Sequence, residues 1–211
     1  GDITDTLESM RRIGFRQVEN APFAGPGRWN DPDMLVVGWV GWGPSLHPTR
    51  LTPDEQYTHM SLWSLLSAPL LIGCDLARLD PFTLNLLTND EVLAIDQDRL
   101  GRQAVPRVRD GDRQVWVKEL ADGSRAIGVF NLGTAPLTHT LDLAALGLEG
   151  TWRLRDVWRQ KDIGPVRDRH RVRVAPHGVV LLSARPAEAG ASPSIPRGSS
   201  AGVALTGPRI E

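Results

Sequence analysis

Apolar residues recur at helical spacing through the first half of the chain and alternate at strand spacing through the second half. Four segments of the first half have the spacing and the starting residues of helices: 3–15, 51–66, 80–87 and 88–98. Two continuous aliphatic runs, within 34–42 and 68–76, are typical of buried parallel strands. The order of these segments predicts alternating helices and strands over residues 1–106.

The helix predicted over 51–66 carries the clearest start signal. Thr52 can act as the N-cap, Pro53 fits the first turn, and Glu55 completes a capping box with Thr52. Asp80 before a proline, and Thr88 three residues before a glutamate, mark the starts of the two following helices. Helix boundaries are therefore expected at these residues.

After about residue 107 the pattern becomes that of short strands. Six segments alternate polar and apolar residues or are rich in β-branched residues: 113–120, 124–132, 137–143, 151–159, 170–176 and 178–184. Asp122–Gly123, between the first two, is typical of a hairpin turn. We expect residues 107–185 to form a small antiparallel β-sandwich. Residues 186–211 are rich in Ala, Ser, Pro and Gly, which predicts a disordered tail.

Only two strands are predicted in the first half, too few to complete a parallel sheet. A parallel strand needs neighbours, because its hydrogen-bonding groups are otherwise open. A (β/α)8 barrel would supply them, but such a barrel takes about 250 residues. Residues 1–106 cannot close one. The first half is therefore expected to be either an unusual open sheet or the second half of a longer fold.

Composition excludes several classes of function. A formal net charge of -1 over 211 residues argues against a nucleic-acid partner held by bulk electrostatics. Cys74 is the single cysteine, so the chain has neither a disulfide framework nor a cysteine-based metal site. The histidines lack the spacing of a metal site, and no apolar run is long enough to span a membrane. Gly1 in place of Met is expected where an N-terminus is processed or missing.

Three blocks of sequence resemble a known family. They are "AGPGRWNDPDML" (24–35), "EQYTHMSLWSLLSAPLLIGCDL" (55–76) and "NDEVLAIDQDRLGRQ" (89–103). In this order and spacing they resemble the C-terminal half of the catalytic barrel of glycoside hydrolase family 27, which includes retaining α-galactosidases. The resemblance implies that residues 1–106 are the C-terminal part of a (β/α)8 barrel. The predicted sandwich resembles the family's C-terminal domain in position and strand pattern.

The same resemblance assigns the catalytic residues. Residues 1–7, "GDITDTL", match the later part of a family motif whose aspartate is the acid/base catalyst, which gives that role to Asp2. Leu7 replaces the family's usual Trp. The family's nucleophilic aspartate lies in an earlier K-x-D motif, which has no counterpart here. Retaining hydrolysis needs two carboxyl groups about 5–5.5 Å apart. We therefore expect the chain to hold half of the catalytic pair and to belong to a longer protein.

Two substrate-binding residues are implied directly after a proline. In the family, the second aspartate of N-D-P-D-M and the methionine after it line the sugar pocket, which gives that role to Asp33 and Met34. Pro32 limits the backbone on both sides and fixes the direction of the flanking carboxylates, and Asp31 is assigned to structural support. Trp39 and Trp42 lie in the following Gly-rich loop. They could stack on a sugar face, and loop or inter-domain packing is at least as good an alternative.

The predicted activity is hydrolysis of terminal α-D-galactosyl residues by a retaining mechanism. The alternatives are α-N-acetylgalactosaminidase or another family 27 specificity, and a non-catalytic truncated remnant or sugar-binding module. The expected partners are α-galactoside oligosaccharides or polysaccharides, with no nucleic acid and no membrane, and the resemblance implies no metal or organic cofactor. Oligomeric state and compartment stay open, since a secreted or periplasmic location would require a signal peptide upstream.

Overall fold

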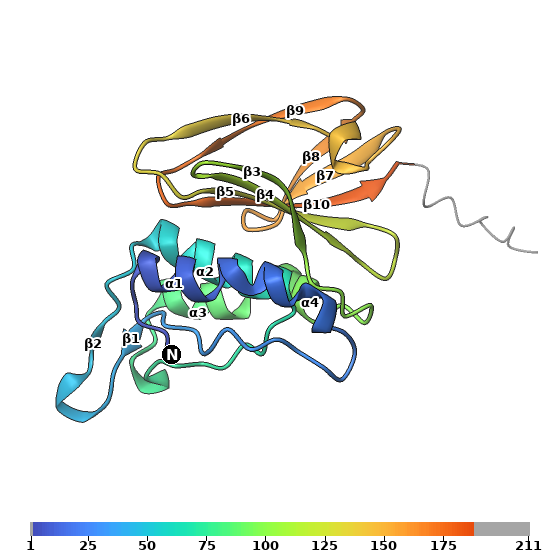
Figure 1. Cartoon of the computed structure of the whole chain (residues 1–211). Coiled ribbons are helices and arrows are strands. Elements are labelled where there is room, and N and C mark those ends of the chain that lie inside the picture. The colour runs from blue at the N-terminus through green and yellow to red at the C-terminus, as the bar shows by residue number, and fades with distance from the viewer. Residues whose placement is uncertain (1, 188–211) are drawn as a thin grey trace, which may run out of the picture.

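The computed structural model describes residues 2–187, which form three layers. The first layer contains the helices α1 (Leu7–Ile13), α2 (Pro53–Leu66), α3 (Pro81–Thr88) and α4 (Asp90–Asp96). A six-stranded sheet lies on these helices, and a two-stranded sheet covers the other face of that sheet (Figure 1). The connecting segments of the first half lie mostly on the side of the helices away from the sheets.

Capping residues set where the helices begin. The predicted capping box of α2 is confirmed, because Thr52 accepts from the Glu55 N–H and Glu55 accepts from the Thr52 N–H. Asp80 caps α3, as predicted. The predicted start of α4 at Thr88 is wrong. Thr88 ends α3, and the Asn89 side chain accepts two backbone N–H groups at the start of α4.

The first helix starts later than its apolar spacing predicts. α1 begins at Leu7 because the Thr6 side chain accepts a hydrogen bond from the Ser9 N–H. A 3-10 helix, η1 (Phe15–Phe23), follows after Gly14. A Cβ at Gly14 would lie 2.5 Å from a Trp63 ring carbon, so glycine is what lets α1 approach α2.

The two aliphatic runs do not form the predicted pair of strands. Leu35 and Ile72 make one isolated parallel bridge. The Leu35 N–H donates to the Leu71 carbonyl at 2.7 Å, and the Gly73 N–H donates to the Leu35 carbonyl at 3.0 Å. The runs are parallel as predicted, but the prediction of full strands is wrong. A parallel pair without neighbours gains few ladder bonds, and Leu71 and Ile72 are 53% and 49% exposed.

A small hairpin follows the first aliphatic run. β1 (Trp39–Val40) pairs with β2 (His47–Pro48) in antiparallel register, and the 3-10 helix η2 (Gly43–Ser45) forms its tip. We refer to residues 38–51 as the mouth hairpin. Figure 1 shows it projecting from the helical layer beside the N-terminal end of the chain. Another 3-10 helix, η3 (Leu76–Arg78), follows the second run.

The six-stranded sheet is antiparallel and has the order β3-β4-β5-β10-β7-β8. Its strands are β3 (Val105–Asp110), β4 (Arg113–Glu119), β5 (Arg125–Asn131), β7 (Trp152–Asp156), β8 (Lys161–Val166) and β10 (Val179–Pro186). The predicted turn joins β4 to β5, and Gly123 in it has a φ of 83°. The sequence patterns did not predict β3 and β8, the two edge strands.

The two-stranded sheet pairs β6 (Leu137–Asp142) with β9 (Arg169–Val174), and the 3-10 helix η4 (Ala144–Leu146) follows β6. The two sheets enclose an apolar core that includes Val115, Ile127, Leu141 and Val172. The last strand runs to Pro186, one residue into the segment predicted to be a tail. Residues 188–211, the rest of that prediction, lie outside the described residues.

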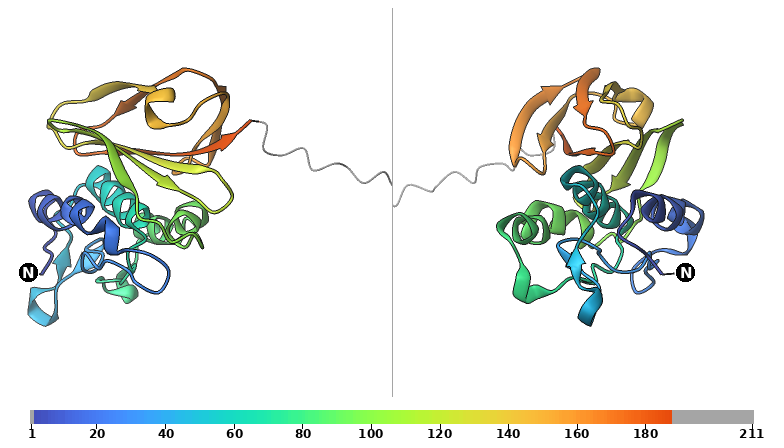
Figure 2. Two further views of the ribbon diagram at one scale, coloured as in Figure 1. Left: turned by 45° about the vertical axis from the view of Figure 1, so that its right-hand side comes forward. Right: turned by 90° about the vertical axis from the view of Figure 1, so that its left-hand side faces the viewer.

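α2 lies between the other helices and the six-stranded sheet (Figure 2). Leu62 and Trp63 of this helix are fully buried. They belong to the same apolar cluster as Trp116, Phe130 and Leu181 of the sheet. The helical half and the strand half therefore share one core. In the part of the chain described here, no helix has the length and apolarity needed to cross a bilayer.

Candidate active site

Two segments that carry predicted site residues meet in space. The Ile3 N–H donates to Asp33 Oδ2 at 2.8 Å, although 30 positions separate the two residues. Asp2 is exposed and directly precedes this bond, whereas Ile3 is buried. The bond therefore holds the backbone next to Asp2 beside the segment that carries Asp33 and Met34.

A tight turn directs the Asp33 side chain. Asp33 has a φ of 75°, in the left-handed region that aspartate tolerates better than most residues. Its N–H donates to Asp31 Oδ1 at 2.8 Å, and its carbonyl accepts from Trp63 Nε1–H at 2.8 Å. Asp33 Oδ1 also accepts the Met34 N–H at 2.7 Å. Both carboxylate oxygens thus bind backbone N–H groups, and each keeps a lone pair for a further donor such as a sugar hydroxyl.

Met34 packs where the two aliphatic runs meet. A Cβ at Gly73 would lie 2.4 Å from Met34 Sδ and 2.8 Å from the Leu35 carbonyl oxygen, so glycine lets the two runs approach this closely. Cys74 follows and is half-buried. Burial, and secondarily the Asp75 carboxylate, raise the pKa of the Cys74 thiol. A raised pKa keeps a thiol protonated, and a protonated thiol is a poor nucleophile.

The two tryptophans of the mouth hairpin differ in how far they are exposed to solvent. Trp39 is half-buried, and the Arg78 guanidinium carbon lies 4.7 Å from the centroid of its ring. The Asp75 N–H donates to the Trp39 carbonyl at 2.8 Å. One ring face of Trp39 is therefore covered by protein. Trp42, at the tip, is 82% exposed.

Asp5 ties the mouth hairpin to the N-terminal segment. Its carboxylate is buried and accepts from the Arg50 N–H at 2.8 Å and from Arg50 Nε at 3.1 Å. His47 Nε2 lies 3.3 Å from the same carboxylate. Burial alone would raise the pKa of Asp5, but the hydrogen bonds from Arg50 outweigh it and lower that pKa. Sequence reasoning missed this anchor, since nothing in the sequence pairs Asp5 with a loop 45 positions away.

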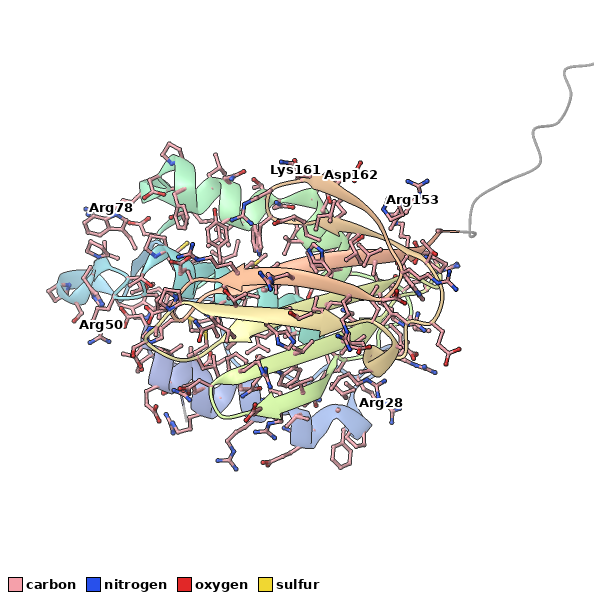
Figure 3. The ribbon with its side chains drawn as sticks, turned by 90° about the horizontal axis from the view of Figure 1, so that it is seen from above. Arg28, Arg50, Arg78, Arg153, Lys161 and Asp162 are labelled. Atoms are coloured by element: carbon pink, nitrogen blue, oxygen red, sulfur yellow. The ribbon has the colours of Figure 1, made fainter. Side chains whose placement is uncertain are left out.

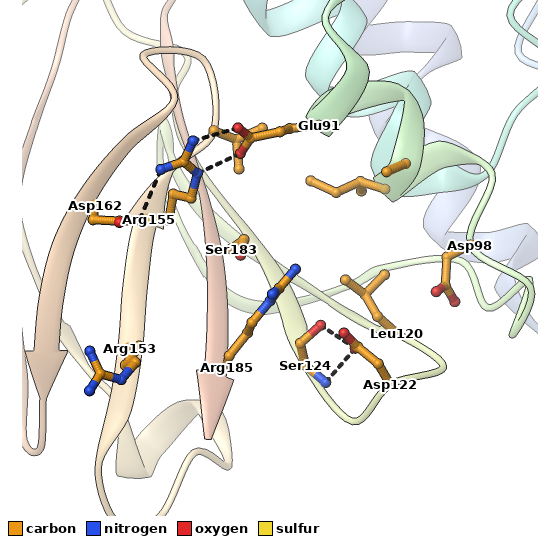
Figure 4. A pocket seen from close by; sticks show the side chains of 13 residues that line it. Glu91, Asp98, Leu120, Asp122, Ser124, Arg153, Arg155, Asp162, Ser183 and Arg185 are labelled. Carbon is orange, nitrogen blue, oxygen red and sulfur yellow. Dashed lines mark hydrogen bonds and ion pairs between the residues drawn. The ribbon is translucent and has the colours of Figure 1, made fainter. Parts of the chain in front are cut away.

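Two cavities bear on where a ligand could sit. One of about 290 Å³ adjoins Asp33 and is lined mostly by polar residues of α1, η1 and the turn. A larger one, of about 610 Å³, lies between α4 and the six-stranded sheet (Figure 4). There Arg155 donates to Glu91 at 2.6 Å and 2.8 Å and to Asp162 at 2.9 Å, and Asp162 lies beside Lys161 on edge strand β8 (Figure 3). The larger cavity contains none of the predicted site residues.

The described residues offer no metal centre, because no group of three or more His, Cys, Asp or Glu side chains among them is placed to hold an ion. Three features bear on chemistry: the exposed Asp2, the Asp33 carboxylate bound to backbone N–H groups, and the hairpin anchored on Asp5. Carboxyl groups act in proton transfer and accept hydrogen bonds from hydroxyls. This arrangement suits recognition of a polyhydroxylated ligand.

Comparisons with known proteins agree with this chemistry. A family model described as alpha galactosidase A matches residues 1–98, and one described as the alpha galactosidase C-terminal beta sandwich domain matches residues 110–184. A β-L-arabinopyranosidase of family 27 from Geobacillus stearothermophilus has a similar structure, with a TM-score of 0.83 and 33% identity, over 89% of this chain and 44% of that one. The chain belongs to glycoside hydrolase family 27.

Other relatives place the chain within the family. Alpha-galactosidase 2 of Arabidopsis thaliana is 38% identical over 185 residues, which are 87% of this chain and 44% of the relative. Alpha-N-acetylgalactosaminidase of Gallus gallus is 33% identical over 190 residues, which are 85% of this chain and 45% of the relative. The chain thus spans a little under half the length of these family 27 relatives.

These findings confirm the predicted family and the predicted fold class, part of a barrel followed by a β-sandwich. The domain boundaries at residues 106 and 185 stay predictions, and so do the roles of Asp2, Asp33, Met34 and Trp39. The structure brings the first three together through the Ile3 N–H. It joins Trp39 to them through the mouth hairpin and Asp5.

Proposed function

We propose that this chain carries the acid/base half of a retaining α-galactosidase site, with Asp2 as the acid/base residue. The hydrogen bond from Ile3 to Asp33 carries the proposal, because it supports one site built from both family motifs. The exposure of Asp2 also supports it, since a general acid must reach the leaving oxygen. The proposed substrates are α-galactoside oligosaccharides or polysaccharides.

In this proposal Asp2 protonates the glycosidic oxygen as the bond to the anomeric carbon breaks. A nucleophilic carboxylate from a segment preceding this chain forms the covalent glycosyl intermediate. Asp2 then removes a proton from the water that hydrolyses the intermediate. Asp33 accepts a sugar hydroxyl through a free lone pair, and Met34 supplies an apolar wall.

Hydrolysis of a chromogenic aryl α-galactoside tests the proposal. The comparison uses the 211-residue chain, a polypeptide extended upstream, and its Asp2→Asn variant. We expect no turnover by the chain alone, turnover by the extended polypeptide, and a loss of about 10²–10⁴ in kcat in the variant. Azide should partly restore the variant, because this anion attacks the glycosyl intermediate without a general base.

Two outcomes would contradict this assignment. Full activity of Asp2→Asn in the extended polypeptide would remove Asp2 from the mechanism. Turnover by the 211-residue chain, abolished by Asp2→Asn, would mean that another carboxylate of this chain is the nucleophile. Asp33 would then be the first residue to test.

A second candidate is β-L-arabinopyranosidase activity. The family 27 member with that activity matches this chain with a TM-score of 0.83. A β-L-arabinopyranoside presents the ring hydroxyls of an α-D-galactoside but lacks its hydroxymethyl group. The ratio of kcat/KM for the two aryl glycosides separates the candidates, since a pocket that binds the hydroxymethyl group favours the galactoside.

A further inference from the structure

The mouth hairpin holds an exposed aromatic side chain at a tip closed by backbone hydrogen bonds. Trp42 is 82% exposed and lies between Gly41 and Gly43, whose φ angles are 95° and 53°. A Cβ at Gly41 would lie 2.4 Å from the Ser45 carbonyl oxygen, so that position requires glycine. The Ser45 N–H donates to the Trp42 carbonyl at 3.0 Å, which closes the tip. The turn therefore fixes where the indole is presented.

The hairpin base is bound on both sides, and on one side it is bound to the segment that carries Asp2. Its returning arm contacts Asp5, three residues after Asp2, through His47 and Arg50. Its outgoing arm accepts the Asp75 N–H at the Trp39 carbonyl. The tip projects beyond both contacts, beside the N-terminal end of the chain (Figures 1 and 2). Trp42 is thus carried by a hairpin whose base is anchored at Asp5, three residues from Asp2.

The hairpin fold does not need the Trp42 side chain. Its backbone bonds, the Asp5 contacts and the Thr49 N–H to Gly38 carbonyl bond of 2.7 Å hold the loop without it. Exposing an indole forgoes the burial energy that such a large apolar group usually supplies. A rigid, exposed aromatic beside a sugar-binding mouth suits contact with the apolar C–H face of a pyranose ring.

We infer that Trp42 forms a binding subsite for the leaving-group side of the substrate, where it stacks on the sugar attached to the galactosyl residue. The inference rests on the proposed function. It adds a determinant of which α-galactosides are cleaved well. Substrates with a sugar leaving group gain from the contact, whereas a leaving group without a ring gains nothing.

The test compares two substrates in the polypeptide extended upstream. Raffinose has a sugar leaving group, and α-galactosyl fluoride has none. We expect Trp42→Ala to lower kcat/KM for raffinose about tenfold and to leave the fluoride unchanged. Trp42→Phe should retain most of the raffinose activity. Phe23→Ala is the matched control, because Phe23 is also exposed, at 67%, and lies on η1.

Equal losses on both substrates would overturn the inference, because the hairpin would then act on the site as a whole. Unchanged raffinose kinetics in Trp42→Ala would overturn it as well. Tryptophan fluorescence during raffinose titration gives a readout independent of hydrolysis. A fluorescence change that Trp42→Ala abolishes supports the subsite even if neither substrate is cleaved, in which case only the proposed function fails.

Discussion

Lys118 of β4 is fully buried and joins the sheet to the ends of two helices. Its ammonium donates to the Ser64 carbonyl at 2.9 Å, the Ser67 hydroxyl at 2.6 Å and the Ile95 carbonyl at 2.6 Å. Ser64 lies in the last turn of α2 and Ile95 in the last turn of α4. These three acceptors use all three donors of the group, and its charge lies where helix C-termini favour a cation.

Lys118→Met keeps the apolar stem and removes the donors. The buried Ile95 carbonyl then loses this partner, at about 1–3 kcal/mol, and the Ser64 carbonyl and Ser67 hydroxyl lose charged hydrogen bonds, although Ser64 keeps the Ser67 N–H at 3.2 Å. Removing a buried charge offsets part of that cost. We expect a net loss of about 3 kcal/mol in the free energy of unfolding. With a urea m-value of about 2 kcal/mol/M, the midpoint falls by about 1.5 M.

Urea unfolding of the 211-residue chain, followed by tryptophan fluorescence, measures this change. Lys161→Met is the matched control, because Lys161 is the other lysine of the sequence and is exposed on β8. The control should stay within about 0.5 kcal/mol of the unsubstituted chain. A Lys118→Met midpoint equal to that of the control, or above it, would refute the reasoning.

Two further predictions concern pH and the junction between the halves. Burial lowers the pKa of His59 to about 3, and its Nε2 accepts the Val36 N–H at 3.1 Å. Between about pH 6.5 and 3 the unfolded state therefore binds a proton that the folded state excludes. The free energy of unfolding falls as the pH drops through this window. His59→Gln should reduce the slope of the unfolding free energy against pH. Arg155→Met should lower the free energy of unfolding through loss of the Glu91 and Asp162 bonds. Urea midpoints measure this change, and a value within error of Arg159→Met, an exposed pair with Asp156, would contradict it.

Local chemistry predicted the helices well and the sheet edges poorly. The capping box of Thr52 and Glu55 depends on residues three apart, so the sequence contains it in full. β3 contains Pro106 and several charged residues, and β8 contains Gly164 and Pro165. These residues weaken a strand pattern, and they are tolerated because an edge strand is paired on one side only. The same residues that keep these edge strands from pairing further also break the strand pattern by which they could have been predicted.

The candidate site was less predictable than the fold. The roles of Asp2 and Asp33 came from family resemblance, because an isolated aspartate carries no signal of its own. The bond between Ile3 and Asp33, and the anchoring of Arg50 on Asp5, join segments 30 and 45 positions apart. Such pairings depend on how helices pack, which local spacing does not encode.

The shared core around α2 constrains how this chain can be recombined. Leu62 and Trp63 pack in one cluster with Trp116, Phe130 and Leu181, so a cut near residue 100 would leave apolar faces on both pieces. A chimera that receives the sandwich from another family member must therefore receive a matching α2 surface as well. For an engineer, the exchangeable module includes α2 and also Phe15 of η1, whose ring centroid lies 6.0 Å from that of Trp116 and 5.2 Å from that of Phe130.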